Sequence, residues 1–294
     1  MANLKEVRNR IVSVTSTQQI TSAMKMVSAA KLRRAQDAIV QMRPYAEKLK
    51  DILGNLSGSV DLSEGGVYAA ERETKKVLIV LITSNRGLAG AFNTNVLKMG
   101  RELISNKYSS QFAAGNVSFL CIGKKASDYV TKNQLNLFSS HNEIYEKLTF
   151  ENVAPVAQKI MDAFANKEFD CVELAYNRFQ NAAVQIPTDE QYLPVSPSEE
   201  SGTKKATSID YIFEPNKEDI VRELIPKSLK VQIYKALLDS HAAEHGARMT
   251  AMNKATDNAR DLIKELKLSY NKARQAAITN EILEIVGGAE ALNG

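Results

Sequence analysis

The chain has 294 residues, of which 44% are hydrophobic and 24% are charged, and its formal net charge at pH 7 is +4. This composition excludes a disordered chain, and the longest apolar runs are far too short to cross a bilayer. Charged residues are spread through positions 1 to 20, so we expect no secretory signal there.

Residues 1–58 are predicted to form one long helix, since the first glycine is Gly54 and only Pro44 interrupts the pattern before it. Apolar residues step by three and four at both ends of this segment: Leu4, Val7, Ile11 and Val14, then Leu32, Ala35, Ile39, Met42, Ala46, Leu49, Leu53 and Leu56. Between these stretches the same register falls on polar Gln18, Thr21, Lys25 and Ser28, whereas the apolar residues are Ile20, Met24 and Val27. We therefore predict a heptad stripe that changes phase in the middle of the helix.

The same segment is strongly basic. It contains ten Lys or Arg residues against four acids. A basic helix of this kind favours an acidic partner, which the charge alone leaves open as nucleic acid, anionic lipid or acidic protein loops.

Residues 59–206 have the alternating pattern of an α/β domain. Predicted strands at 77–83, 117–122 and 170–176 alternate with helices at 92–107, 124–133 and 152–167. This order indicates βαβ units with right-handed crossovers, and thus a Rossmann-like domain with a parallel sheet. Residues 179–195 are expected to form an extended edge, because Pro187 and Pro194 do not suit a central strand. The polar segment 196–205 is predicted to be a mobile loop.

Residues 207–294 are expected to form a closing strand and then a second long helix. From 227 to 286 there is no proline, and the only glycine is Gly246. An apolar face is interrupted by a run of small residues: Ala242, Ala243, Gly246, Ala247, Ala251, Ala255 and Ala259. A helix this long needs a partner along its apolar stripe. The predicted fold is therefore a long antiparallel coiled coil of the N- and C-terminal helices, with the Rossmann-like domain inserted between them.

The turn "SNRGLAGAFN" (84–93) raises the question of a nucleotide site, because it follows a buried strand and precedes a helix. Its glycines, Gly87 and Gly90, give G-x-x-G and not a complete phosphate-binding motif. Gly123-Lys124-Lys125 also lacks the required spacing and hydroxyl. We interpret both as structural turns and expect no cofactor.

Histidines His241 and His245 with Glu244 fit H-x-x-E-H, the inverted zinc-protease pattern. His141 is the only other histidine, and a coiled-coil helix offers no substrate cleft, so we expect neither a metal site nor a catalytic site. The two cysteines, Cys121 and Cys171, lie in apolar strands and are interpreted as buried free thiols.

Three segments resemble the gamma subunit of the F-type ATP synthase: "VRNRIVSVTSTQQITSAMKMVSAAKLRRAQ" (7–36), "SNRGLAGAFN" (84–93) and "ARMTAMNKATDNARDLIKELKLSYNKARQAAITNEILEIVGGAEAL" (247–292). "YNRFQNAAVQIPTDEQYLP" (176–194) and "YIFEP" (211–215) fit the same family. The chain departs from the family's usual S-D-R-G-L-C-G at Asn85 and Ala89, and it has Ala243 where the family often has Ser. The chloroplast members' cysteine insertion is absent, so the resemblance implies no thiol control.

The resemblance implies a non-catalytic rotor shaft that couples proton-driven rotation of the c-ring to the catalytic cycle of the beta subunits. The implied partners are three alpha subunits, three beta subunits, the epsilon subunit and the c-ring, with no nucleic acid and with membrane contact only through the c-ring. With no transit peptide expected, the implied location is the cytoplasmic face of a bacterial inner membrane.

Six residues match the positions at which the family's shaft contacts alpha and beta: Met24, Lys25, Arg248, Arg274, Gln275 and Thr279. Two other hypotheses are a nucleotide-binding α/β enzyme and a basic coiled-coil adaptor for nucleic acid. ATP turnover by the isolated chain would favour the first, and salt-sensitive binding to DNA or RNA would favour the second.

Overall fold

A computed structural model describes residues 4–57, 67–70, 72–195 and 217–293. The chain divides into two compact units: one contains residues 1–28 and 248–294, which we call the shaft unit, and the other contains residues 29–247, which we call the sheet unit. The predicted loop at 196–205 and the predicted strand after residue 207 lie outside the described residues.

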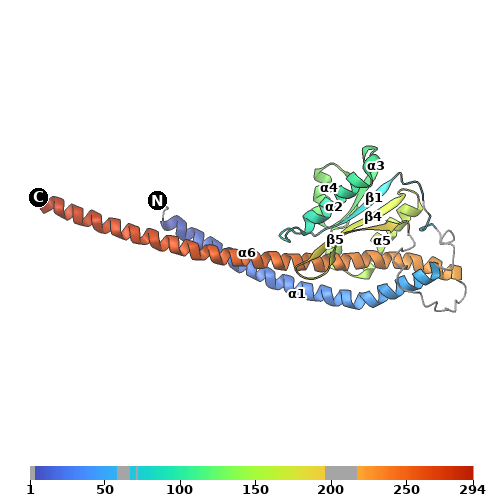
Figure 1. Cartoon of the computed structure of the whole chain (residues 1–294), viewed down its shortest axis with the longest axis horizontal. Helices are drawn as coiled ribbons and strands as arrows, with labels where there is room; N and C mark the ends of the chain where they lie inside the picture. Colours follow the sequence, from blue (N-terminus) through green and yellow to red (C-terminus); the bar gives the residue numbers. More distant parts are fainter. Residues whose placement is uncertain (1–3, 58–66, 71, 196–216, 294) are drawn as a thin grey trace. The chain divides into compact units, whose positions relative to one another are not determined.

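The sheet unit is built on a five-stranded sheet (Figure 1). The strands are β1 (Val77–Ile82), β2 (Val117–Ile122), β3 (Asn136–Ser140), β4 (Cys171–Phe179) and β5 (Gln185–Leu193), in the spatial order β3-β2-β1-β4-β5. Strands β1 to β4 pair in parallel, and β5 pairs with β4 in antiparallel fashion at the edge. The predicted edge at 179–195 is therefore confirmed, with Pro187 inside β5.

Helices cover both faces of the sheet (Figure 1). Helices α2 (Phe92–Asn106) and α4 (Lys124–Lys132) pack on one face, and α5 (Phe150–Ala165) and the first part of α6 (Lys217–Asn293) pack on the other. Two short helices, α3 (Ser109–Ala113) and the 3₁₀ helix η2 (Glu143–Glu146), complete the connections. Alternate residues of β1 divide between the two cores: Val77, Ile79 and Leu81 face α2, whereas Leu78, Val80 and Ile82 face α5.

One buried carboxylate ties the end of α2 to the sheet. Glu173 of β4 is 1% exposed, and it accepts hydrogen bonds from the Lys107 ammonium and from the Tyr108 hydroxyl. Both donors stabilise the charged form of the carboxylate, which offsets the cost of removing it from water.

The two long helices are α1 (Leu4–Ser57, 54 residues) and α6 (77 residues), and helices account for more than half of the chain. Pro44 and Pro226 lie within them without ending them.

The predicted phase change in α1 is wrong. The buried and half-buried positions keep one register through the polar stretch: Leu4, Val7, Ile11, Val14, Gln18, Thr21, Lys25, Ser28, Leu32, Ala35, Ile39, Met42, Ala46 and Leu49. Thr21 and Ser28 are buried, whereas Ile20 and Val27 are 59% and 57% exposed. The same face of α1 is therefore buried throughout, although polar residues lie on it between Gln18 and Ser28. A change of phase would need a local change of helical pitch.

Contacts between α1 and α6 occur within each unit, and in the shaft unit they run antiparallel. In the shaft unit Lys25 bonds to Asn253 and Thr21 bonds to Thr256, so a step back along α1 is a step forward along α6. In the sheet unit one small hollow is lined from both helices: by Ile39, Met42 and Arg43 of α1 and by Lys235, Leu238 and Asp239 of α6.

Helix α6 is buried around its whole circumference in one stretch. From Ala236 to Ala247 every residue except half-buried His241 is buried. The small residues here (Ala242, Ala243, Gly246 and Ala247) allow other backbone to approach closely. A Cβ on Gly246 would lie 3.2 Å from both Cα and O of Ala182, which is tighter than an ordinary van der Waals contact.

We predict that Gly246→Val lowers the stability of the full chain by about 1–3 kcal/mol, because the side chain would overpack this site. Gly287→Val is the matched control, since a Cβ at Gly287 meets nothing within 4 Å. Thermal and denaturant unfolding, followed by circular dichroism, provides the measurement. Equal stability of the two variants would show that α6 is not closely packed at Gly246.

Candidate functional site

The position at which Rossmann-like domains bind nucleotides is filled by protein. The strand order places β2 on one side of β1 and β4 on the other, so the crevice for a ligand would open between the C-terminal ends of β1 and β4. Ala243 and Ala247 of α6 pack there against Ala89 and Phe92, with Phe179 against the same cluster. The small-residue face of α6 therefore occupies the space that a nucleotide would need.

The turn at 84–93 is held by its own side chains. The Asn93 side-chain carbonyl accepts from the Ser84 amide at 2.9 Å, and the Ser84 hydroxyl donates to the Arg86 carbonyl at 2.6 Å. Ala89 and Phe92 are 1% and 2% exposed. The turn supports packing against α6, in agreement with the prediction that its glycines are structural.

The amides at the N-terminus of α4 are also engaged. The Lys124, Lys125 and Ala126 amides donate to Asn85 Oδ1, the Ser84 carbonyl and Thr83 Oγ1. Gly123 has φ +101°, and a Cβ there would lie 2.1 Å from the Thr83 carbonyl oxygen, so the site requires glycine. With these donors taken, Gly123-Lys124-Lys125 has no free cradle for a phosphate.

The two histidines of the H-x-x-E-H pattern lie inside the sheet unit. Their Nε2 atoms are 3.1 Å apart, and the ring of His241 stacks on that of Tyr145 at 5.8 Å between centroids. Within the described part of the chain, no group of three or more His, Cys, Asp or Glu side chains is placed to hold a metal ion. The arrangement is that of packed core side chains.

Both cysteines are buried free thiols, as predicted. Burial raises the pKa of the Cys121 thiol to about 12 and also raises the pKa of Cys171. A thiol with a raised pKa is a poor nucleophile at neutral pH, so neither residue is suited to thiol catalysis.

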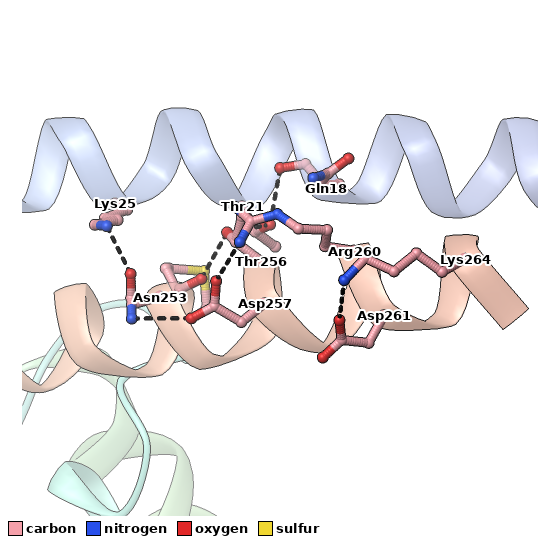
Figure 2. A network of polar contacts seen from close by, with 10 residues as sticks. Gln18, Thr21, Lys25, Asn253, Thr256, Asp257, Arg260, Asp261 and Lys264 are labelled. Carbon is pink, nitrogen blue, oxygen red and sulfur yellow. Dashed lines mark hydrogen bonds and ion pairs between the residues drawn. The ribbon is translucent and has the colours of Figure 1, made fainter.

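The surface with a distinctive arrangement is the helix pair of the shaft unit. Figure 2 shows polar side chains meeting across it: the Lys25 ammonium donates to Asn253 Oδ1 at 2.6 Å, and the Thr256 hydroxyl donates to the Thr21 hydroxyl at 2.8 Å. Asn253 also donates to Asp257, one turn along α6, at 3.2 Å.

The six predicted contact residues fall into two groups on this pair. Met24 and Lys25 are half-buried on α1, and Arg248 is buried on α6, five residues before the Lys25 partner Asn253. Arg274, Gln275 and Thr279 are all exposed, and the Thr279 hydroxyl donates to the Gln275 carbonyl of its own helix. Gln275 follows Arg248 by 27 residues of helix, or about 40 Å, so the two groups are separate surfaces.

The second group belongs to a stretch of α6 that continues past its partner. Seven-residue steps from the Thr21–Thr256 pair place Val14 opposite Ile263 and Val7 opposite Tyr270, which brings α1 close to its first described residue. From Arg274 to Ala289 every residue of α6 is exposed. Large apolar side chains are among them: Ile278, Ile282, Leu283, Ile285 and Val286.

Other exposed apolar residues were not among the predicted contacts. Val12, Ile20, Met26 and Val27 of α1 are between 57% and 65% exposed. The signal that finds them is the heptad itself: if the Leu4–Val14 register is extended without a break, these four residues fall outside the seam with α6.

Asp239 of α6 is an acidic residue buried in the sheet unit. It is 3% exposed, and its Oδ1 makes no hydrogen bond within the described residues. Burial raises the pKa of Asp239, although the positive charges of Lys235, Arg43 and Arg178 partly oppose this effect and Glu190 adds to it. The ionised form of Asp239 therefore lowers the free energy of unfolding.

Among the described helices, none has an apolar stretch that is long enough to span a bilayer.

Comparison with known proteins gives a consistent answer along the whole chain. A sequence-family model described as ATP synthase matches residues 3–292. The ATP synthase gamma chain of Cytophaga hutchinsonii is 57% identical over 294 residues, and that of Flavobacterium johnsoniae is 60% identical over 294 residues. In both cases the match covers 100% of each chain.

Solved structures agree in fold. A chain in the cryo-EM structure of the Euglena gracilis mitochondrial ATP synthase, containing OSCP, F1 and c-ring, aligns with a TM-score of 0.68. The alignment covers 98% of this chain and 94% of that chain at 22% identity. A rotor structure from the same organism aligns with a TM-score of 0.64 at 22% identity over 94% of this chain and 98% of that chain. At this identity the likeness shows the fold of a paired-helix and α/β protein.

We predict that Asp239→Asn raises the free energy of unfolding at pH 7, because it removes a buried charge. A folded-state pKa above the ordinary 3.8 means that the carboxyl favours the fold when protonated, and that this stability is lost as pH rises from 3.8 through the raised value. The gain from Asn should therefore vanish below about pH 4.

Denaturant unfolding between pH 3 and pH 8 measures this difference. Asp261→Asn is the matched control, since Asp261 lies on the surface of the same helix and pairs with Lys264. A gain for Asp239→Asn that is the same at every pH, or no larger than that of the control at pH 7, would contradict the prediction.

Proposed function

The chain belongs to the family of ATP synthase gamma chains, and on that premise we propose that it is the central rotor shaft of an F-type ATP synthase. As such it is a non-catalytic subunit, and the nucleotides bind on other subunits of the complex.

The observation that carries this proposal is the solitary end of α6. Its side chains from Arg274 to Ala289 are exposed, and Ile278, Ile282 and Ile285 form an apolar stripe at helical spacing. An exposed apolar stripe on a helix is typical of a surface that binds another protein, so we infer that apolar side chains of a partner surround the end of α6. We propose that a ring of three alpha and three beta subunits supplies this surround.

The exposed basic residues of α1 favour an acidic partner. Arg8 and Arg10 in the shaft unit are exposed, and so are Lys31, Arg33 and Arg34 in the sheet unit. Among the described residues, no carboxylate lies at salt-bridge distance from these five cations. Such cations contribute little to the fold, and they attract acidic loops of a partner. We propose that the acidic lever loop of beta passes close to these residues.

The proposed mechanism depends on asymmetry. Helix α6 continues from the sheet unit into the shaft unit, so a torque applied to the sheet unit is transmitted along one covalent helix. As the shaft turns, it presents different side chains to each beta subunit. Only a contact whose strength differs between the conformations of a beta subunit can shift the populations of those conformations. A shaft with unlike faces presents a different contact to each of the three beta subunits.

The six predicted residues have specific roles in this proposal. Lys25 uses one of its three donor protons on Asn253, so it retains donors for an acidic loop beside Met24. The guanidinium of Arg274 and the amide of Gln275 supply exposed hydrogen-bonding groups to catalytic-subunit loops. The Thr279 hydroxyl has its proton committed to Gln275, so it acts as an acceptor. Arg248 is 8% exposed, so of the six residues it offers the least surface to alpha and beta.

The remaining partners are proposed from the family. The sheet unit would bind the epsilon subunit and the c-ring, and proton flow through the ring would turn it. The chain would then lie at the cytoplasmic face of a bacterial inner membrane, and it would reach the bilayer only through the c-ring.

The filled crevice at Ala243 and Ala247 argues against a nucleotide-binding enzyme. The isolated chain should show no saturable binding of ATP, and stoichiometric binding in a calorimetric titration would contradict the proposal. Binding to DNA or RNA without partner subunits would favour the adaptor hypothesis.

We predict that the combined change Arg274→Ala and Gln275→Ala weakens assembly with alpha and beta by roughly thirtyfold, if each lost contact costs about 1 kcal/mol. Both side chains are exposed, so the helicity of the isolated chain should not change. Co-purification of the full chain with alpha and beta, followed by ATP hydrolysis assays, measures the effect. Arg101→Ala, an exposed arginine of α2, is the control.

Wild-type assembly and wild-type hydrolysis in the double variant would reject the contact role of these two residues. Failure of the unaltered chain to assemble at all would instead reject the rotor proposal.

A further inference from the structure

Between Gln18 and Ser28 the seam of the shaft unit is polar at positions where a coiled coil normally places apolar side chains. Thr21 and Thr256 are each 8% exposed, Ser28 is 3% exposed, and Lys25 is half-buried. Polar groups in a seam contribute less to helix association than the apolar residues that they replace. Their presence therefore needs an explanation other than strength of binding.

The bonds across this seam connect particular partners. The Thr21 and Thr256 hydroxyls lie 2.8 Å apart. Each also lies within hydrogen-bond distance of a carbonyl of its own helix, Gln18 at 3.0 Å for Thr21 and Met252 at 2.8 Å for Thr256, so one of the two hydroxyl protons serves the bond between the helices. Figure 2 shows the Lys25 ammonium directed at Asn253, whose amide in turn donates to Asp257. Both bonds join one residue of α1 to one residue of α6.

An apolar heptad seam lacks this selectivity. Because the pattern repeats every seven residues, sliding one helix past the other by seven places apolar on apolar again. The buried residues of α1 in the sheet unit (Leu32, Ala35, Ile39 and Leu49) would tolerate such a shift in type. A shift by seven would separate Thr21 from Thr256 and Lys25 from Asn253, so both hydrogen bonds between the helices would be lost.

We propose that the polar seam of Thr21, Lys25, Asn253 and Thr256 fixes the axial register of α1 on α6. The wrong register differs by one heptad, which is about 10 Å along the helix. The seam thereby sets how far the solitary end of α6 extends beyond α1. This inference concerns contacts within the chain and does not depend on the rotor proposal.

Four positions report the register when cysteines are introduced in pairs. The native register places Val14 opposite Ile263 and Val7 opposite Tyr270, whereas a shift by one heptad places Val14 opposite Tyr270 or Val7 opposite Ile263. A disulfide requires a Cα–Cα distance below about 7 Å, so a native pair and a shifted pair cannot both form in one register. Cys121 and Cys171 are buried and do not compete.

The test compares three seams in the full chain. These are the wild-type seam, an apolar seam (Thr21→Val, Lys25→Leu, Asn253→Leu and Thr256→Val) and a control with exposed changes (Thr17→Val and Lys254→Leu). Circular dichroism confirms that each remains helical, and oxidation followed by denaturing electrophoresis measures each cross-link.

We expect the wild-type and control seams to cross-link only the native pairs, and the apolar seam to cross-link at least one shifted pair to a comparable yield. Native cross-links alone in a helical apolar-seam variant would overturn the proposal. If that variant loses helicity, Thr21→Val with Thr256→Val is compared in the same way. A purely native pattern in that variant would also overturn the proposal.

Discussion

The packing of α6 into the end of the sheet is the constraint on which the rest of the structure depends. Ala243, Gly246 and Ala247 bring the helix against Phe92, Phe179 and Ala182, at a distance that a larger side chain would not permit. This contact fills the crevice in which a Rossmann-like domain would bind its ligand. The same small residues therefore fill the position that a nucleotide would occupy, and they hold a long helix against the sheet.

That fixed joint explains how an α/β domain can serve a mechanical role. Helix α6 is held on the sheet over Ala236–Ala247 and continues without a break to Asn293. Its partner α1 pairs with it through a seam that is apolar at both ends of α1 and polar between Gln18 and Ser28. The polar residues contribute less stability than apolar residues would, but they fix the axial register of α1 on α6, as buried polar residues do in other coiled coils. A shaft needs a defined length and defined faces, and alignment supplies both.

Most of the fold could be predicted from the sequence because its elements have strong local patterns. The six-residue run at Val77–Ile82 and the small-residue run from Ala242 identify a buried strand and a close-packed helix. Strand β3 was missed because Asn136–Ser140 lies at an edge and carries little apolar sequence. The phase of α1 was predicted wrongly because apolar Ile20 and Val27 were assumed to be buried, yet both are exposed. Hydrophobicity alone places these two residues in the seam, whereas the register of Leu4–Val14, extended without a break, leaves them outside it.

The central claim is that this chain turns, and the most direct measurement is rotation. The alpha–beta complex would be immobilised with the full chain inside it, and a bead would be attached through Asn136→Cys, an exposed position in β3. The buried thiols of Cys121 and Cys171 leave the new cysteine as the accessible one. Addition of ATP should turn the bead in one direction with three resting positions per revolution. ATP hydrolysis by the same complexes with a stationary bead would contradict the account.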